Sequence, residues 1–281
     1  MAVQTAPAPR PATPESPHLP KIARKDAWWI GPLWFFVLFS AFVVWTTFRT
    51  FQNAYYDTDY GFKHHLSPYY LSPFYSPTIV VGWTVLGYHI SPAIWILIFP
   101  LSFRLSCYYY RKAIYRSYLA DPLACAVTEP APLEKSRFKR YMGERGFPLI
   151  AMNFHRYAFY AAVVFIIILW YDTVLAFLFP NSGGGVHFGI GIGSLVFLVN
   201  ILLLTCYTFS CHSWRHLIGG TVNCYSCSLA NQTRYGLWKK VTFLNERHGL
   251  WAMLSLISVG LTDVYVWLVA SGRITDFHLL K

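Results

Sequence analysis

Five apolar segments limit the folds open to this chain more than any other feature of its sequence. Each is near or above the ~20 residues that a helix needs to span a membrane. Aromatic residues such as Trp28, Trp29 and Trp267 mark several of the segment ends, which is typical at the level of lipid headgroups. The segments are residues 28–48, 79–103, 150–179, 188–213 and 247–270. This pattern predicts an all-α integral membrane protein in which five transmembrane helices form a bundle.

The composition supports a membrane protein and argues against a nucleic-acid-binding one. Hydrophobic residues make up 55% of the 281 residues and charged residues only 12%, whereas soluble domains carry about 25% charged residues. The net charge of +11 does not indicate a nucleic-acid surface, because many Lys and Arg residues collect in the loops over 104–149 and 214–246. Such loops can contact anionic headgroups, so we expect membrane lipid, and no nucleic acid, as a partner.

The distribution of Lys and Arg also predicts the orientation of the helices. Residues 1–27 and the two basic loops hold most of them, whereas the 49–78 connection has only Arg49 and Lys63. By the positive-inside rule, the N-terminus then lies in the cytoplasm and the C-terminus outside. The N-terminal segment is rich in Pro and Ala without apolar periodicity, so we expect a disordered tail rather than a signal peptide.

The chain therefore divides into three predicted parts. A cytoplasmic tail covers residues 1–27, a five-helix membrane domain covers 28–272, and an outer C-terminal tail covers 273–281. Within the membrane domain, we expect the aromatic, proline-rich 49–78 connection to form an ordered cap along the outer headgroups. The basic 104–149 loop fits a docking surface and a plain solvated loop equally well.

One short stretch concentrates residues that bind metals. It reads CYTFSCHSWRHLIGGTVNCYSC from Cys206 to Cys227 and contains four of the six cysteines and two of the ten histidines. We expect the fourth helix to carry His212 and His216 on one face, with Cys211 about 100° away around the same helix. The cytoplasmic side is reducing, which disfavours structural disulfides. Thiolate and imidazole groups at this density indicate a metal or cluster site.

The predicted topology brings further histidines to the same depth, at the starts of the third and fifth helices. The Gly219-Gly220 turn can return the CxxC pair toward the end of the fourth helix. The complete set of candidate ligands is Cys211, Cys224, Cys227, His155, His212, His216 and His248.

Three interpretations of this set stay open. The first is a [2Fe–2S] cluster with two Cys and two His ligands, as in Rieske centres. The second is haem b held by two histidines, such as His155 with His216 or His248, which leaves the cysteines without a role. The third has no cofactor, and the histidines then form hydrogen bonds between helices. A polytopic transporter that uses Asp172 and Asp263 is an alternative of another class, although the sequence shows no repeated halves.

The motifs NFHRY, CHSWRHLIGG and LNERHGLWA resemble those of a known family. They are similar to the single-subunit, five-helix membrane anchors of bacterial succinate dehydrogenase, respiratory complex II. The resemblance covers residues 28–272 and is strongest to the mycobacterial type, whose anchor is associated with a Rieske-type [2Fe–2S] cluster. The surplus of cysteines departs from the pattern of anchors with two haems, and it favours the cluster over haem b.

The resemblance implies partners and a reaction that lie partly outside this chain. A flavoprotein subunit would oxidise succinate, and an iron–sulfur subunit would pass the electrons to this anchor for quinone reduction. The chain would then belong to a succinate:quinone oxidoreductase of the respiratory chain and the tricarboxylic acid cycle, in the bacterial plasma membrane. We expect quinone at the cytoplasmic edge, where polar side chains can bind its carbonyls. The candidates for that role are Arg156, Ser213, Trp214 and Arg215.

Overall fold

The structure is a computed structural model that describes most of the predicted membrane domain. The described residues are 26–58, 69–78, 84–85, 88–119, 145–146, 149–180, 185–220 and 222–280. The predicted N-terminal tail lies outside this range except for its last two residues. Most of the basic 104–149 loop also lies outside it.

The described chain is mostly helical, as the sequence predicts. The helices are α1 (Ile30–Gln52), α2 (Pro92–Leu105), α3 (Tyr108–Tyr118), the 3-10 helix η1 (Leu149–Phe154), α5 (His155–Leu175), α6 (Ile192–Phe209), α7 (His212–Gly219), α8 (Leu229–Asn245) and α9 (His248–Ala270). Short strands form three antiparallel two-stranded sheets, which pair β1 (Thr84–Val85) with β2 (Tyr88–His89), β3 (Leu178–Pro180) with β4 (Val186–Phe188), and β5 (Ile190–Gly191) with β6 (His278–Leu280).

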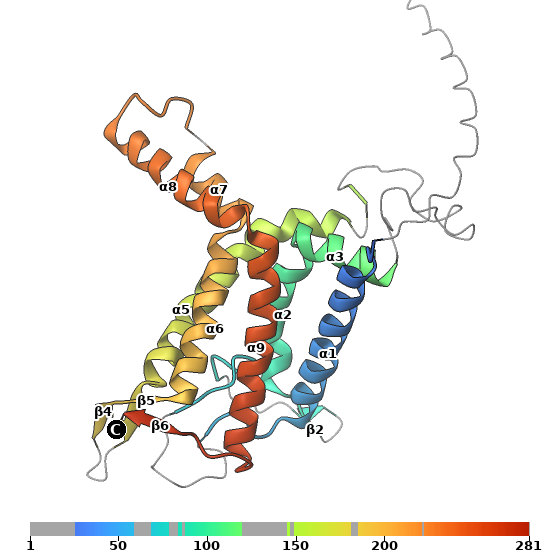
Figure 1. Cartoon of the computed structure of the whole chain (residues 1–281), viewed down its shortest axis with the longest axis vertical. Helices are drawn as coiled ribbons and strands as arrows, with labels where there is room; N and C mark the ends of the chain where they lie inside the picture. The colour runs from blue at the N-terminus through green and yellow to red at the C-terminus, as the bar shows by residue number, and fades with distance from the viewer. Residues whose placement is uncertain are drawn as a thin grey trace, which may run out of the picture.

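Four of the described helical segments are long and apolar enough to cross a membrane, and there are five spans if α2 and α3 count as one. Figure 1 shows α1, α2, α5, α6 and α9 side by side in a bundle, with α7 and α8 projecting from one end and the C-terminus at the other. We call these the α7–α8 end and the C-terminal end. Which end faces the cytoplasm stays a prediction.

Two predicted helices differ from the structure. The second was expected over 79–103, but α2 begins at Pro92, a residue that favours the first helical position, and a β-hairpin precedes it. Directly after α2 the chain bends by 83° into α3. The fourth was expected over 188–213, but α6 ends at Phe209, and Cys211 has an extended backbone with ψ 141°. Cys211 and His212 therefore do not lie on one continuous helix, contrary to the prediction.

The 49–78 connection is ordered where it is described, but it does more than lie along the headgroups. Tyr70 and Tyr75 are almost fully buried inside the bundle. The Tyr75 hydroxyl donates a hydrogen bond to the Arg49 carbonyl at 2.6 Å, and the Tyr70 hydroxyl donates one to Asp276 at 2.5 Å. The cap therefore ties α1 to the C-terminal segment from within the core.

A buried ion pair joins the first and last membrane helices near the C-terminal end. Arg49 Nε lies 2.9 Å from Asp263 Oδ2, and neither side chain is exposed. Asp263 also accepts hydrogen bonds from Trp45 Nε1 at 2.8 Å and Ser72 Oγ at 2.5 Å. A carboxylate with its charge and oxygens satisfied in this way holds the helices together, which argues against the transporter role considered for it.

We predict that Asp263→Asn lowers stability strongly, because it leaves the Arg49 charge buried without a partner. The cost is about 3–5 kcal/mol, which corresponds to a fall in the thermal midpoint of the order of 10 °C. The measurement is thermal unfolding of the purified complex in detergent.

Asp172→Asn is the matched control for this experiment. Asp172 is also buried, but its described partner is the neutral Ser76 hydroxyl rather than a cation. It should therefore lose much less stability. Equal losses at the two positions would contradict the role given to the Arg49–Asp263 pair.

Candidate metal centre

Two corners of the chain, at the α7–α8 end of the bundle, share one local sequence pattern. An aromatic residue is followed three and four positions later by Ser and Cys, as Phe103-x-x-Ser106-Cys107 and as Tyr207-x-x-Ser210-Cys211. In both cases the Ser caps the end of one helix and the Cys, in extended conformation, caps the start of the next. This backbone change turns both thiols into the core, where they are only 2% and 1% exposed.

Two histidines meet these corners from the starts of α5 and α9. His155 Nε2 lies 3.1 Å from Cys211 Sγ, and its Nδ1 lies 2.9 Å from Ser106 Oγ. His248 Nε2 lies 3.5 Å from Cys107 Sγ, and its Nδ1 lies 2.6 Å from Ser210 Oγ. Each imidazole therefore joins the Ser of one corner to the Cys of the other.

Aromatic rings enclose this crossed arrangement. Phe103 stacks on His155 with ring centroids 4.8 Å apart, and Tyr207 stacks on His248 at 5.1 Å. The Tyr207 hydroxyl is buried, and its nearest polar neighbour is the Cys107 thiol. Burial raises the pKa of the Cys211 thiol, and the nearby Cys107 raises it further. Cys107, Cys211 and His248 are buried and His155 is partly buried, and we call these four residues the crossed site; the Tyr207 hydroxyl lies beside the Cys107 thiol.

Three of the predicted ligands come together here, and a fourth residue was missed. His155, Cys211 and His248 belong to the predicted set, whereas Cys107 does not. The signal that could have found it is the repeated aromatic-x-x-Ser-Cys pattern at the ends of two apolar segments.

The other predicted histidine ligands lie outside this arrangement. His212 and His216 are exposed on α7, and Arg156 Nη2 donates to His216 Nδ1 at 2.7 Å.

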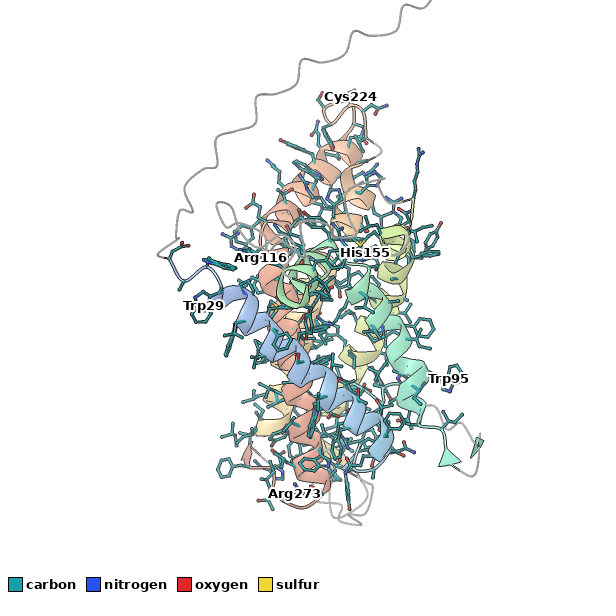
Figure 2. All side chains as sticks on the ribbon, turned by 90° about the vertical axis from the view of Figure 1, so that its right-hand side faces the viewer. Trp29, Trp95, Arg116, His155, Cys224 and Arg273 are labelled. Carbon is teal, nitrogen blue, oxygen red and sulfur yellow. A yellow bond between two sulfur atoms is a disulfide. The ribbon has the colours of Figure 1, made fainter. Side chains whose placement is uncertain are left out.

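The CxxC pair differs most from the prediction. Cys224 and Cys227 form a disulfide, and a disulfide sulfur is not the thiolate that ligates a metal. The predicted return of this loop to the helix end is also wrong, because Figure 2 shows Cys224 at the tip of the projection, far from His155. The CxxC spacing is compatible with a local disulfide as well as with a pair of metal ligands.

The residues predicted to contact quinone do not form one pocket. Arg156 pairs with His216 on the surface. Arg215 donates to Thr242 Oγ1 at 3.1 Å and stacks over Trp238. Trp214 packs against Phe159 and Phe209, and the Ser213 amide bonds to Cys211 Sγ. None of the four lines the cavity between α1, α3 and α9 or the other two main cavities.

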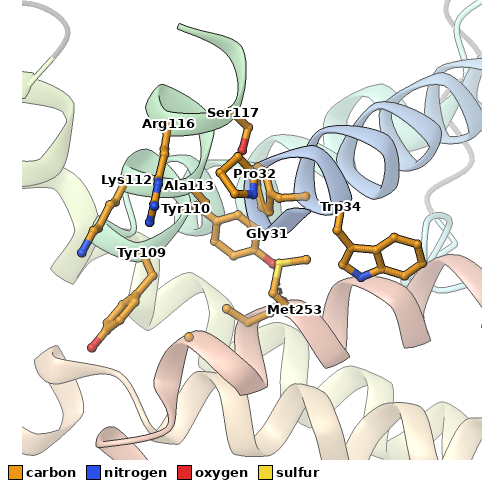
Figure 3. Close-up of a pocket in the computed structure, with 13 residues that line it drawn as sticks. Gly31, Pro32, Trp34, Tyr109, Tyr110, Lys112, Ala113, Arg116, Ser117 and Met253 are labelled. Carbon is orange, nitrogen blue, oxygen red and sulfur yellow. Dashed lines mark hydrogen bonds between the residues drawn. The ribbon is translucent and has the colours of Figure 1, made fainter. Parts of the chain in front are cut away.

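A cavity of about 410 Å³ lies next to the crossed site instead, between α1, α3 and α9. Figure 3 shows Tyr109, Lys112 and Arg116 at its polar side and Trp34 and Met253 at its apolar side. Its volume falls in the range of small-molecule sites, which is about 300–1,000 Å³. The Tyr109 ring also meets the His248 ring edge-to-face at 5.4 Å, so one side chain contacts both the cavity and the site.

A second cavity lies deeper in the bundle, under the aromatic rings of the site. Phe103, Arg104 and Tyr207 form part of its wall, and its volume is about 160 Å³. This is below the range of small-molecule sites, so we do not assign a substrate to it.

The donor set contains the ligand types of a Rieske-type cluster. No three described His, Cys, Asp or Glu side chains converge as the ligands of one ion would. Two thiols and two imidazoles, each imidazole held at Nδ1 by a serine, are the ligand types of a Rieske centre, which places two protein ligands on each iron. Hydrogen bonds at the second ring nitrogen are the usual way in which proteins orient such histidines.

Fold and site together define a multi-pass membrane protein with a buried set of two thiols and two imidazoles. The model of the actinobacterial succinate dehydrogenase subunit SdhC family matches residues 30–272, and the chain belongs to this family. It is therefore a membrane-anchor subunit of a bacterial succinate dehydrogenase, in the plasma membrane. This confirms the resemblance seen in the sequence.

A solved structure is similar over almost the whole chain. It is the Mycobacterium smegmatis Sdh1 complex in the apo form, with 40% sequence identity and a TM-score of 0.76. The match covers 96% of this chain and 97% of the other. Among curated proteins, no match was found.

We predict that the thiols differ sharply in reactivity. In the folded complex, a maleimide should leave Cys107 and Cys211 unmodified because both are buried, and it should modify them after unfolding. Cys224 and Cys227 should react only after a reductant opens their disulfide. Peptide mass spectrometry measures each site, and modification of Cys107 or Cys211 in the folded complex would contradict the burial described here.

Proposed function

We propose that this chain carries electrons through a Rieske-type [2Fe–2S] cluster held by Cys107, His155, Cys211 and His248, and that it supports quinone reduction beside that cluster. The observation that carries the proposal is the crossed set of contacts, in which each histidine reaches a Cys of one corner and a Ser of the other. When bound, such a cluster takes up and gives up one electron, at a higher potential than a cluster with four Cys ligands.

The residues of this chain have separate tasks in that role. Ser106 and Ser210 hold the imidazoles at Nδ1, which leaves each Nε2 directed at the site. Phe103 and Tyr207 exclude water by stacking on the imidazoles. The Tyr207 hydroxyl is available as a donor to a sulfur atom, and hydrogen bonds to sulfur are one of the factors that set cluster potentials.

Haem b at the same residues is the weaker alternative. An axial histidine needs an open path from Nε2 to the iron of a large planar ring. Here both Nε2 atoms face cysteine sulfur atoms at 3.1 and 3.5 Å, and stacked aromatic rings cover the imidazoles. These contacts favour the cluster.

The partners that we propose are the other subunits of succinate dehydrogenase. A flavoprotein subunit would oxidise succinate, and an iron–sulfur subunit would deliver the electrons at the α7–α8 end. The similarity to a chain of the mycobacterial Sdh1 complex supports this assembly, and so does the position of the crossed site at the same end of the bundle.

We propose the cavity between α1, α3 and α9 as the quinone site. It is lined by Trp34 and other apolar residues of α1, and it has polar groups from Tyr109, Lys112 and Ser117 that can bind quinone carbonyls. Tyr109 connects it to His248. Arg156, Ser213, Trp214 and Arg215, the candidates from the sequence, do not line this cavity.

We predict that alanine at any of the four proposed ligands removes the cluster from the complex. Electron paramagnetic resonance of the mildly reduced complex should show a Rieske-type signal in the wild type. That signal should be lost in Cys107→Ala, His155→Ala, Cys211→Ala and His248→Ala, together with two iron atoms per anchor.

His212→Ala and His216→Ala are the matched controls, because both histidines are exposed on α7. They should retain the signal and the iron. Strong reduced-minus-oxidised haem bands without a Rieske-type signal would reject the cluster in favour of haem b.

We predict that filling the proposed quinone cavity raises KM for quinone. A Cβ at Gly31, which lines the cavity, would meet no atom within 4 Å, so Gly31→Leu occupies the space without a clash at its base. A roughly tenfold rise corresponds to ~1.4 kcal/mol of lost binding. Steady-state kinetics with a soluble quinone measure it, while succinate oxidation by a dye that accepts electrons from the iron–sulfur subunit should not change.

Gly236→Leu is the control for the added side chain. A Cβ at Gly236 on α8 is equally free of neighbours, but this glycine lies outside the cavity. An unchanged KM in Gly31→Leu, or equal changes in the two variants, would exclude this cavity as the quinone site.

A further inference from the structure

Arg104 is a buried cation without an anionic partner among the described residues. It lies in the last turn of α2 and is 8% exposed. Its guanidinium donates hydrogen bonds to the Tyr110 hydroxyl, to the Ala252 carbonyl at 3.2 Å and to Ser255 Oγ at 3.2 Å. All three acceptors are neutral, so they satisfy its hydrogen-bonding groups but not its charge.

Arg49, the other buried arginine described, is balanced by a carboxylate. Arg49 is bonded to the Asp263 carboxylate, so that part of the bundle contains a balanced pair. The positive charge of Arg104 is balanced less completely. The negative pole of the α2 C-terminus lies near it, and the faces of the Tyr207 and Tyr110 rings lie at 4.8 and 5.4 Å. Removal of a charge from water is costly unless an opposite charge lies nearby.

The position of Arg104 brings this charge to the crossed site. It follows Phe103, which stacks on His155, and it precedes Cys107 by three residues. The guanidinium lies over the face of the Tyr207 ring, and this ring also stacks on His248. The corresponding residue at the second corner is the neutral Thr208, so the two otherwise similar corners differ in charge at this position.

A cluster with two thiolate and two neutral imidazole ligands would become negatively charged when it is reduced. The two thiolates balance the 2+ charge of the oxidised [2Fe–2S] core, so uptake of one electron leaves a net charge of −1. In a buried site this added charge is poorly screened, and a nearby fixed cation stabilises it. The cation therefore favours the reduced form.

We propose that Arg104 sets the reduction potential of this cluster by holding an uncompensated positive charge beside it. The inference rests on the proposed function, because it needs the cluster to be present. Arg104 is not a ligand in this proposal. Its charge shifts the equilibrium between the oxidised and the reduced cluster. The electron itself comes from the reduced iron–sulfur subunit.

The test is a potentiometric titration of the Rieske-type signal in the purified complex. Arg104→Gln keeps a polar side chain but removes the charge, and the ratio of reduced to oxidised cluster at fixed potential should fall about tenfold. That change corresponds to a lowering of the midpoint reduction potential by ~59 mV for a one-electron couple. Arg104→Lys retains the charge and should lie much closer to the wild type.

Two further variants separate charge from packing. Ser255→Asp would place a carboxylate against an intact Arg104, and it should lower the midpoint as Arg104→Gln does, so the test stands if the glutamine variant fails to fold. Arg49→Gln changes a buried arginine that already has its own carboxylate, and the midpoint should stay unchanged in the molecules that retain the cluster.

The outcomes distinguish this inference from the proposed function. A wild-type signal whose midpoint is the same in Arg104→Gln or in Ser255→Asp overturns the role of Arg104 and leaves the cluster in place. A shift of equal size in Arg104→Lys also overturns it, because packing rather than charge would then be responsible. A wild type without any Rieske-type signal overturns the proposed function and this inference together.

Discussion

The crossed contacts between two histidines and two Ser-Cys corners are the interaction on which the α7–α8 end of this protein depends. Each imidazole joins α5 or α9 to the ends of both α2 and α6. Both cysteines face inward because the chain leaves its helix at the preceding serine, so the helix breaks and the buried thiols have one common cause. The site and the packing of four helices are therefore not separable, and a change of one ligand is also a change at a helix junction.

The sequence predicts the membrane helices well but their breaks poorly. Apolar length is a property of about twenty residues taken together, and it identifies the four helical segments that could each cross a membrane, with a fifth where α2 and α3 count as one span. A break depends on a few residues, such as Pro92 at the start of α2 or Ser210 before Cys211, and tertiary contacts decide which of them ends a helix. For this reason α2 was predicted too early and α6 too long.

The candidate site shows the same limit at the level of single residues. His155, Cys211 and His248 could be chosen from their depth in the predicted topology. Cys107 could not, because it follows the predicted end of the second membrane segment, and the bend between α2 and α3 is what returns it to the core. Cys224 and Cys227 had the spacing of a ligand pair, but spacing does not reveal that their loop lies at the far tip of a projection.

The two buried arginines show how one bundle can use the same side chain in opposite ways. Near the C-terminal end, Arg49 is paired with Asp263 and fixes α1 to α9, with no net charge left over. At the other end, Arg104 also bonds to α9, through Ala252 and Ser255, but it brings a charge that these neutral groups cannot balance. A neutral hydrogen-bond donor at this position could also join α2 to α9. The positive charge of Arg104 would stabilise a negative charge that forms beside it in this low-dielectric region, as reduction of the proposed cluster would produce.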